Sequence, residues 1–547
     1  MKYTFTLFIL ITLIAMSTFQ TKTKADLIVY NAKVYTVDSD FSVVTAFAVK
    51  DGKVLTTGSD KAILDQYEAP EQINEQGRAV YPGFNDGHSH FLSYGMSLIR
   101  WADLVGTQSF EEVLDKVKAH HDQLKSFWIL GRGWDQNDWK NTDYPDNTLL
   151  NRLYPNNPVV LTRIDGHAVL ANAKALELAG ITPQTKIEGG EIVLDHGKLT
   201  GVLIDNALDI VQMVIPEATQ EEKTKALLEA QRNCFAEGLT TVTDAGLDKA
   251  DILLLDRLQK EGKLDIRIYA MMSPTQENFD EFFTTGPVHN GRLTVSAVKL
   301  YIDGALGSRG ALLLKPYSDM PGHFGLRLHP MDYYDSICAK AYKAGFQVNT
   351  HAIGDSGNRI MLQTYARFLK GKNDRRWRIE HAQVLSPEDF HYFGDYSVIP
   401  SIQSTHCTSD MYWAEKRLGP VRIKTAYAYK QLMEENGWEV NGTDFPIEDI
   451  SPLKTFYAAV ARKDIKGWPS GGFEMENALS RRDALYSVTL WPAKGSFDEK
   501  QKGSLEPGKV ADFVVLDQDI MNCPEATIPH VKVLSTYVSG KKVYSSR

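Results

Sequence analysis

The chain has 547 residues, of which 60 are basic and 69 acidic, so its formal net charge is -9. This length favours a large domain with an accessory one, and the acidic balance argues against general nucleic-acid binding. Four cysteines without a Cys-x-x-Cys pair exclude a disulfide scaffold, whereas fourteen histidines supply many potential metal ligands.

The first 24 residues have the character of a secretory signal. Lys2 precedes an apolar run at 7–16, which suits a signal and is short for a membrane-spanning helix of about 20 residues. No clear small-x-small cleavage site follows, so an uncleaved membrane anchor stays open as the alternative. We expect an exported protein, periplasmic or secreted, with no membrane contact beyond this segment.

Short β-type runs dominate both ends of the remaining chain. Near the N-terminal end, the run at 46–50 leads into Asp51-Gly52, a dipeptide typical of a β-hairpin. Near the C-terminal end, similar runs fall at 510–516, 531–538 and 543–544. We therefore predict β structure at both ends of the chain.

Helical and β-type stretches alternate in the middle of the chain. A helical stretch at 223–230 precedes a β-type run at 239–243, and further such runs fall at 298–301, 346–350 and 378–380. Alternation of this kind over this length predicts an α/β fold, a (β/α)₈ TIM-type barrel. The region at about 131–206 is rich in Trp, Asn and Asp and is interpreted as an insertion over the barrel mouth.

One short motif suggests a metal site. His88 and His90 follow a β-type run at 78–81. Residues two apart in an extended chain point the same way, so both imidazoles can face one ion. Two polar residues at a strand end are the alternative for a lone His-x-His pattern.

Four further polar residues stand in or at the ends of later predicted strands: Lys299, His351, His381 and Asp444. Each has an ordinary alternative, as a surface lysine, a hydrogen-bonded core histidine or a helix cap. Their order on successive strands of a barrel, after the two histidines, favours a common site at the catalytic mouth.

With these residues in place, the chain resembles the amidohydrolase superfamily, in particular the amidohydrolase 3 branch of N-substituted formamide deformylase-like metal-dependent hydrolases. The resemblance covers nearly everything after the signal. It rests on motifs at 82–90 (PGFNDGHSH), 131–136 (GRGWDQ), 163–167 (RIDGH), 299–307 (KLYIDGALG), 351–355 (HAIGD), 380–382 (EHA), 442–446 (GTDFP) and 503–512 (GSLEPGKVAD).

The resemblance implies a domain plan. A small composite β-sandwich would be built from 25–80 and 491–547, with the hydrolase barrel at 81–490 between the two halves. Two positions depart from the family pattern: Ser404 stands where proline is frequent, and Thr443 where serine is frequent.

The resemblance also implies roles. His88 and His90 would bind one divalent metal with Asp444, and His351 and His381 would bind a second. Lys299 would bridge the two as an N6-carboxylated side chain. One or two zinc ions suit this donor set best, with manganese or iron as alternatives. Asp444 would move the proton from the activated water to the leaving amine.

Four residues are candidate substrate contacts: His167, His406, Asp165 and Trp134. For His167 the alternative is a loop histidine bonded to nearby backbone, and for Trp134 it is core packing.

The function expected is an exported metal-dependent hydrolase that cleaves a non-peptide amide, N-acyl or N-formyl bond of a small molecule. The alternatives are a cyclic amidase, deaminase or esterase on the same site, or a binding or regulatory protein on the same fold. A homodimer is left open.

Overall fold

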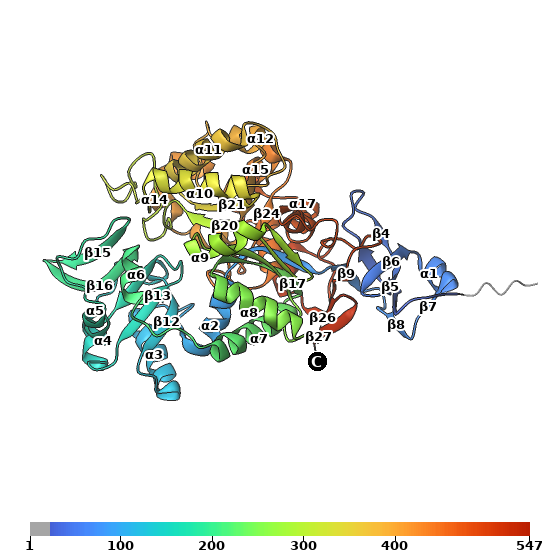
Figure 1. Cartoon of the computed structure of the whole chain (residues 1–547), viewed down its shortest axis with the longest axis horizontal. Helices are drawn as coiled ribbons and strands as arrows, with labels where there is room; N and C mark the ends of the chain where they lie inside the picture. Colours follow the sequence, from blue (N-terminus) through green and yellow to red (C-terminus); the bar gives the residue numbers. More distant parts are fainter. Residues whose placement is uncertain (1–21, 547) are drawn as a thin grey trace, which may run out of the picture.

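The computed structural model describes residues 22–546 (Figure 1). The predicted signal at 1–24 therefore lies almost wholly outside the described residues. Among the residues that are described, no helix has the length and apolar character needed to cross a membrane.

A barrel of eight parallel strands forms the centre of the molecule. In spatial order they are β10 (Phe84–Ser89), β17 (Leu239–Leu247), β18 (Arg267–Met272), β20 (Leu293–Tyr301), β21 (Gln347–Ala352), β22 (Arg378–His381), β23 (Ile399–Ile402) and β24 (Val440–Asn441). The loop after β24 completes the ring, since Asp444 N–H donates to the His88 carbonyl at 2.8 Å and His90 N–H to the Phe445 carbonyl at 2.9 Å. The predicted (β/α)₈ barrel is confirmed.

The strands and helices follow the expected physical pattern. All six residues of β18 are buried, as in a strand covered on both sides. Helices cover the outside, among them α7 (Gln220–Ala236), α8 (Lys249–Lys260), α10 (Met331–Ala344) and α11 (Asp355–Leu369). Thr219 and Glu222 form a capping box at the start of α7, and Gly345 ends α10 with a positive φ of 81°.

A second sheet projects from one side of the barrel, at the left of Figure 1. Its order is β11 (Ala102–Asp103), β12 (Ile129–Trp134), β13 (Val159–Arg163), β14 (Ala168–Ala171), β16 (Lys198–Asp205) and β15 (Gly190–Asp195). We call residues 102–205 the accessory lobe. It has apolar cores of its own on both sides of the sheet. The insertion expected at 131–206 falls in this lobe, whose sheet begins earlier in the chain, at Ala102.

Two further sheets lie at the opposite side of the barrel. One contains β6 (Lys53–Gly58), β5 (Ala46–Lys50), β2 (Leu27–Tyr30) and β8 (Glu71–Asn74). The other joins both chain ends, in the order β27 (Lys541–Ser545), β26 (Val533–Val538), β25 (Phe513–Leu516), β9 (Ala79–Pro82), β3 (Lys33–Tyr35) and β4 (Val43–Val44).

Apolar side chains of these two sheets share one core. Phe47 on β5 meets Phe513 on β25 edge to face, with ring centroids 5.1 Å apart. The first barrel strand, β10, follows β9 directly, with only Gly83 between them. The sheet that joins both chain ends therefore leads directly into the barrel.

Candidate metal centre

The predicted ligand residues meet at the carboxyl ends of the barrel strands. His88 lies near the end of β10, Lys299 in β20, His351 in β21 and His381 at the end of β22, and Asp444 follows β24. This end of a (β/α)₈ barrel is where active sites are built, because the loops there can vary without disturbing the barrel.

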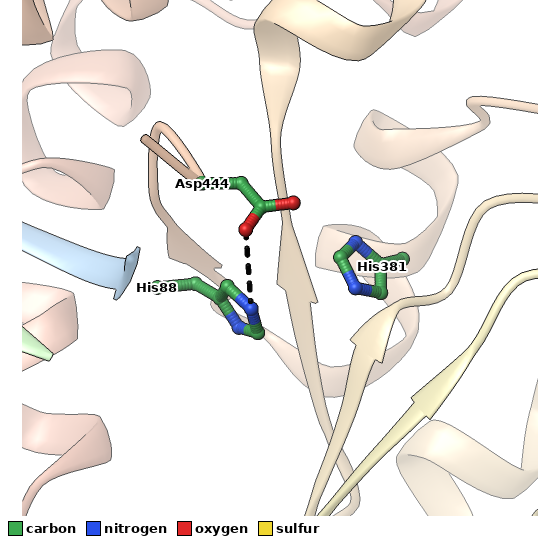
Figure 2. A group of neighbouring side chains, drawn as sticks. All are labelled: His88, His381 and Asp444. Carbon is green, nitrogen blue, oxygen red and sulfur yellow. Dashed lines mark ion pairs between the residues drawn. The ribbon is translucent and has the colours of Figure 1, made fainter. Parts of the chain in front are cut away.

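Three of these residues come close enough to share an ion. Ligand atoms of His88, His381 and Asp444 all lie within 4.8 Å of one another, and the three residues are buried. In Figure 2 the Asp444 carboxylate stands beside the His88 ring, and His381 approaches from the other side. The His88 Nε2 to Asp444 Oδ1 distance is 3.5 Å.

The remaining predicted ligands surround this group. His90 Nε2 lies 3.3 Å from Asp444 Oδ1, and Lys299 Nζ lies 3.2 Å from His88 Nε2. The His351 and His381 rings have centroids 4.5 Å apart. All six sequence-predicted ligands thus occur in one cluster.

The protonation of these side chains suits a cation. Burial lowers the pKa of His88 to about 4 and holds the pKa values of His351 and His381 well below the ordinary range, so these imidazoles are neutral donors. Burial by itself would raise the pKa of Asp444, but His88, His406 and His90 hold it well below its ordinary value. The set therefore offers neutral nitrogens and one carboxylate.

One buried atom fits the same interpretation. Asp444 Oδ1 is buried and accepts no hydrogen bond from any described residue. A buried polar atom without a partner is costly, and coordination to a divalent ion would remove that cost. The donor set, two or more imidazoles with a carboxylate, matches what zinc and similar ions bind.

Partners behind the histidines fix the ring orientations. Glu380 Oε2 accepts a hydrogen bond from His88 Nδ1, and Gln403 Oε1 accepts one from His381 Nδ1 at 2.6 Å. These contacts leave the Nε2 atoms directed at the cluster and raise the basicity of the rings. Sequence reasoning assigned no role to Glu380 or Gln403. The signal available for Glu380 was a carboxylate directly before His381 in the motif at 380–382.

Asp86 ties the end of β10, which carries His88, to the loop after β24, which carries Asp444. Its Oδ2 accepts from Thr443 Oγ1 at 2.6 Å, and its Oδ1 accepts from the N–H groups of His88 at 3.0 Å and Thr443 at 3.1 Å. The hydroxyl of Thr443 therefore makes this bond where the family often has serine. The result is that His88 and Asp444 are held face to face across the barrel closure.

A cavity of about 720 Å³ opens above the cluster. Its floor includes His90, Lys299, His351, His381 and Asp444. The accessory lobe contributes Arg132, Arg163, Asp165 and His167 to the walls. The lobe thus completes a cavity whose floor is the candidate metal centre.

The predicted substrate contacts His167, Asp165 and His406 line this cavity. His167 Nδ1 lies 2.8 Å from Asp205 Oδ1, and Asp165 Oδ1 accepts from the His167 backbone N–H at 3.0 Å. Asp165 Oδ2 also accepts from Arg163 at 2.6 Å. Both side chains are therefore held in place before any substrate arrives.

His406 stands between two carboxylates. Its Nε2 lies 3.3 Å from Asp444 Oδ2 and its Nδ1 lies 3.0 Å from Glu448 Oε1. Burial alone would lower the pKa of His406, but these two bonds raise it to about 10, so the ring is an imidazolium. Ser404, which stands in place of proline, begins the same helix, α13 (Ser404–Asp410), and donates its N–H to Asn441 Oδ1 at 3.2 Å.

Trp134 lies apart from this set. Only 1% of its surface is exposed, its indole N–H donates to the Leu161 carbonyl at 2.8 Å, and it packs against Trp139. It is absent from the cavity lining. The structure therefore places Trp134 in the core of the accessory lobe, because a bulge in β12 turns its side chain inward.

The fold and the cluster define a metal-dependent hydrolase. The chain belongs to the amidohydrolase family, whose model matches residues 71–544.

Three similar proteins agree with this assignment. The protein LONG AFTER FAR-RED 3 of Arabidopsis thaliana is 33% identical over 95% of this chain and 92% of its own length. N-substituted formamide deformylase of Arthrobacter pascens is 26% identical over 94% and 97%. A crystal structure of an uncharacterized metal-dependent hydrolase from Pyrococcus horikoshii is 31% identical, with a TM-score of 0.75 over 91% of this chain and 99% of that one.

Proposed function

We propose that this protein hydrolyses a carbon–nitrogen bond, in an amide, N-acyl or N-formyl group of a small molecule. The observation that carries the proposal is Oδ1 of Asp444, a buried carboxylate oxygen at the floor of the cavity that accepts no hydrogen bond from the described residues. The similarity to an N-substituted formamide deformylase supports the bond type.

The residues that would hold the metal follow from the cluster. His88, His90 and Asp444 would bind one divalent ion, and His351 and His381 a second, with zinc as the best match and manganese or iron as alternatives. Bound there, such an ion supplies Lewis-acid chemistry, since it activates a water molecule and polarises a carbonyl group.

Asp444 is placed to move the proton. Its Oδ1 would accept a proton from the attacking water and then deliver it to the nitrogen that leaves. The His406 imidazolium, 3.3 Å from Oδ2, keeps the carboxylate ionised until that step. His167 and Asp165 on the cavity wall would orient the substrate.

Lys299 would act as a carbamate. Burial lowers the pKa of Lys299 to about 8, so part of the amine is unprotonated near neutral pH. That nitrogen can attack CO₂, forming a C–N bond and releasing a proton. The product carries anionic oxygens where the ammonium, a poor metal ligand, stood.

The decisive test combines a substrate screen with one substitution. Zinc-reconstituted protein is assayed against N-acyl and N-formyl compounds, and Asp444→Asn is expected to reduce kcat by about 10³-fold or more with the fold retained. Asp449→Asn is the control, because Asp449 is an exposed carboxylate at the cavity rim, and it should stay within about twofold of the parent. Full activity in Asp444→Asn would refute the role of Asp444. If the protein hydrolysed only esters, cyclic amides or amino-substituted rings, the proposed bond type would be wrong.

A second experiment addresses the carbamate. Lys299→Ala should lose bound metal and activity, and added short carboxylates such as acetate should restore part of both. Carbon-13 NMR of protein equilibrated with labelled bicarbonate should show a carbamate signal that Lys299→Ala lacks. A wild-type spectrum without that signal would contradict the modification.

Export and assembly complete the proposal. The segment at 1–24 would direct the chain to the periplasm or the medium, which fractionation with and without that segment would test. A homodimer is the assembly to be checked by light scattering, where a monomer mass would exclude it.

A further inference from the structure

We propose that Arg132 recognises a carboxylate or similar oxyanion on the substrate, so that the enzyme acts on amides that combine an apolar body with an anionic end. This inference rests on the proposed function, since it names the substrate class of the same cavity. It follows from the GRGWDQ motif, whose arginine has no part in the metal centre.

A bulge in β12 sends the side chains of Arg132 and Trp134, which are two residues apart, in different directions. The pairing of β12 with β13 shifts register between Arg132 and Trp134, and Gly133 between them has a φ of +110°. A Cβ on Gly133 would lie 2.8 Å from the Val105 backbone nitrogen. The glycine thus permits a bulge that places Trp134 in the lobe core and Arg132 on the cavity wall.

The guanidinium of Arg132 is poorly satisfied by the protein. Its Nη2 donates one bond, to the Ile164 carbonyl at 3.3 Å, and its Nε is buried without a hydrogen-bond partner among the described residues. Its carbon lies 5.9 Å from the Trp101 ring centroid. No carboxylate of residues 22–546 forms an ion pair with it. An arginine has five N–H donors, and most of these donors remain for a ligand.

The neighbouring arginine shows the contrast. Arg163 also lines the cavity, but it donates to Gln136 Oε1 at 2.8 Å, to Asp165 Oδ2 at 2.6 Å and to Asp135 Oδ1. Asp165 is thereby committed to Arg163 and to the backbone of His167. The donors of Arg163 are therefore bound within the protein, whereas within residues 22–546 Arg132 contacts only one carbonyl oxygen and one aromatic face.

The wall beside Arg132 is apolar. Tyr94, Leu98, Trp101 and Val105 line the same cavity, and Leu98 and Val105 leave 45% and 52% of their surface exposed. Large exposed apolar side chains inside a cavity are suited to an apolar ligand. A planar guanidinium next to such a wall suits a carboxylate, which it can bind through two hydrogen bonds.

The rim also carries carboxylates, and they define the competing outcome. Asp103 and Asp138 line the cavity and are exposed. If their charge dominated, a neutral or cationic ligand would bind better than an anionic one. Comparing the binding of an acid with that of its uncharged amide therefore decides whether the cavity prefers an anionic ligand or a neutral or cationic one.

Binding is measured by calorimetry with 3-phenylpropionate and 3-phenylpropionamide on zinc-loaded protein. We expect the acid to bind on the order of tenfold more tightly than the amide. Arg132→Gln should abolish this preference. Arg132→Lys keeps the positive charge but cannot form two parallel hydrogen bonds to a carboxylate, so it should retain part of the preference. Arg232→Gln, an exposed arginine on α7, is the matched control and should leave the preference unchanged.

Three results would overturn the proposal. In the first, Arg132→Gln weakens binding of the acid and of the amide equally. In the second, Arg132→Gln still prefers the acid, because the metal holds the carboxylate, and in the third the wild-type protein prefers the amide. Thermal melting tests whether both Arg132 variants are folded. If Arg132→Gln is not folded, the ratio of acid affinity to amide affinity in Arg132→Lys decides. Because binding needs no turnover, a failure of the hydrolysis screen leaves this result intact and is separable from it.

Discussion

Replacing Glu380 with glutamine tests whether the candidate metal ligand His88 needs an anionic hydrogen-bond partner. Glu380 accepts from His88 Nδ1, from Ser401 Oγ at 2.7 Å and from Arg378 Nη2 at 3.0 Å. Neither Glu380 nor Arg378 has measurable exposure. The substitution keeps the shape of the side chain but removes its charge, so His88 loses an anionic acceptor and Arg378 loses its counter-ion.

Glu380→Gln is expected to lower both the metal affinity and the stability of the fold. Loss of an oriented acceptor behind a metal-binding histidine typically weakens metal affinity by about 10–100-fold, or roughly 1.4–2.7 kcal/mol. Leaving Arg378 charged and uncompensated in a fully buried site costs about 3–5 kcal/mol of unfolding free energy. The bonds from Arg378 to the Gly87 carbonyl at 2.7 Å and Ser401 Oγ at 2.6 Å remain and reduce that cost.

Two assays separate these two effects. Zinc affinity is measured by competition with a chromophoric chelator, and stability by denaturant unfolding of the metal-free protein. Glu439→Gln is the matched control, because Glu439 is equally buried but its carboxyl oxygens have no hydrogen-bond partner among the described residues. Burial raises the pKa of Glu439 well above its ordinary value. Its neutral acid resembles glutamine, so the change should cost about 1 kcal/mol or less.

The reasoning would be refuted by a Glu380→Gln protein that binds zinc within about twofold of the parent. It would also be refuted if Glu439→Gln destabilised the metal-free protein as much as Glu380→Gln does. In the first case His88 needs no anionic partner, and in the second the cost belongs to any change at a buried carboxyl group.

Two further predictions concern the scaffold. Asp519, bonded to Lys33, Tyr35 and Tyr81, has its pKa lowered to about 2; burial alone would raise it, but these bonds and Asn522 outweigh that effect. A carboxyl group with a depressed pKa stabilises the fold at pH values above its unfolded pKa near 4, and this stabilisation is lost as the pH falls towards 2. Asp519→Asn should therefore lower the free energy of unfolding by about 1–2 kcal/mol at pH 6, a figure that allows for solvent screening of a partly exposed group. The Tm difference from wild type should shrink between pH 4 and pH 3, and a constant difference would contradict the assignment. Gly87→Ala would place a Cβ 2.1 Å from Val440 Cγ1 and 2.9 Å from the Asn441 carbonyl oxygen, so it should destabilise the barrel closure by about 1–3 kcal/mol in denaturant unfolding. Gly471→Ala, with no heavy atom within 4 Å, should be neutral, and equal effects of the two changes would refute the clash.

Much of the site was accessible from residue order. His88, His90, Lys299, His351, His381 and Asp444 could be selected because polar residues at strand ends of a parallel barrel share one mouth. Trp134 could not be placed, because its direction depends on a bulge at Gly133 that no periodicity reveals. Glu380 and Gln403 were missed because nothing in the sequence shows which polar residue at the end of a barrel strand hydrogen-bonds to a histidine ligand.

The sequence by itself determined the barrel, the family and the candidate ligands, since hydrophobic rhythm and motif order are properties of the chain alone. Only the tertiary structure decided which side chains face one another. It showed that Asp86 and Thr443 lock His88 against Asp444, and that the accessory lobe brings Arg132 to a cavity built by the barrel. The physical reason is that hydrogen-bond partners far apart in the chain, and the direction of a side chain at a bulge, are set by packing rather than by local pattern.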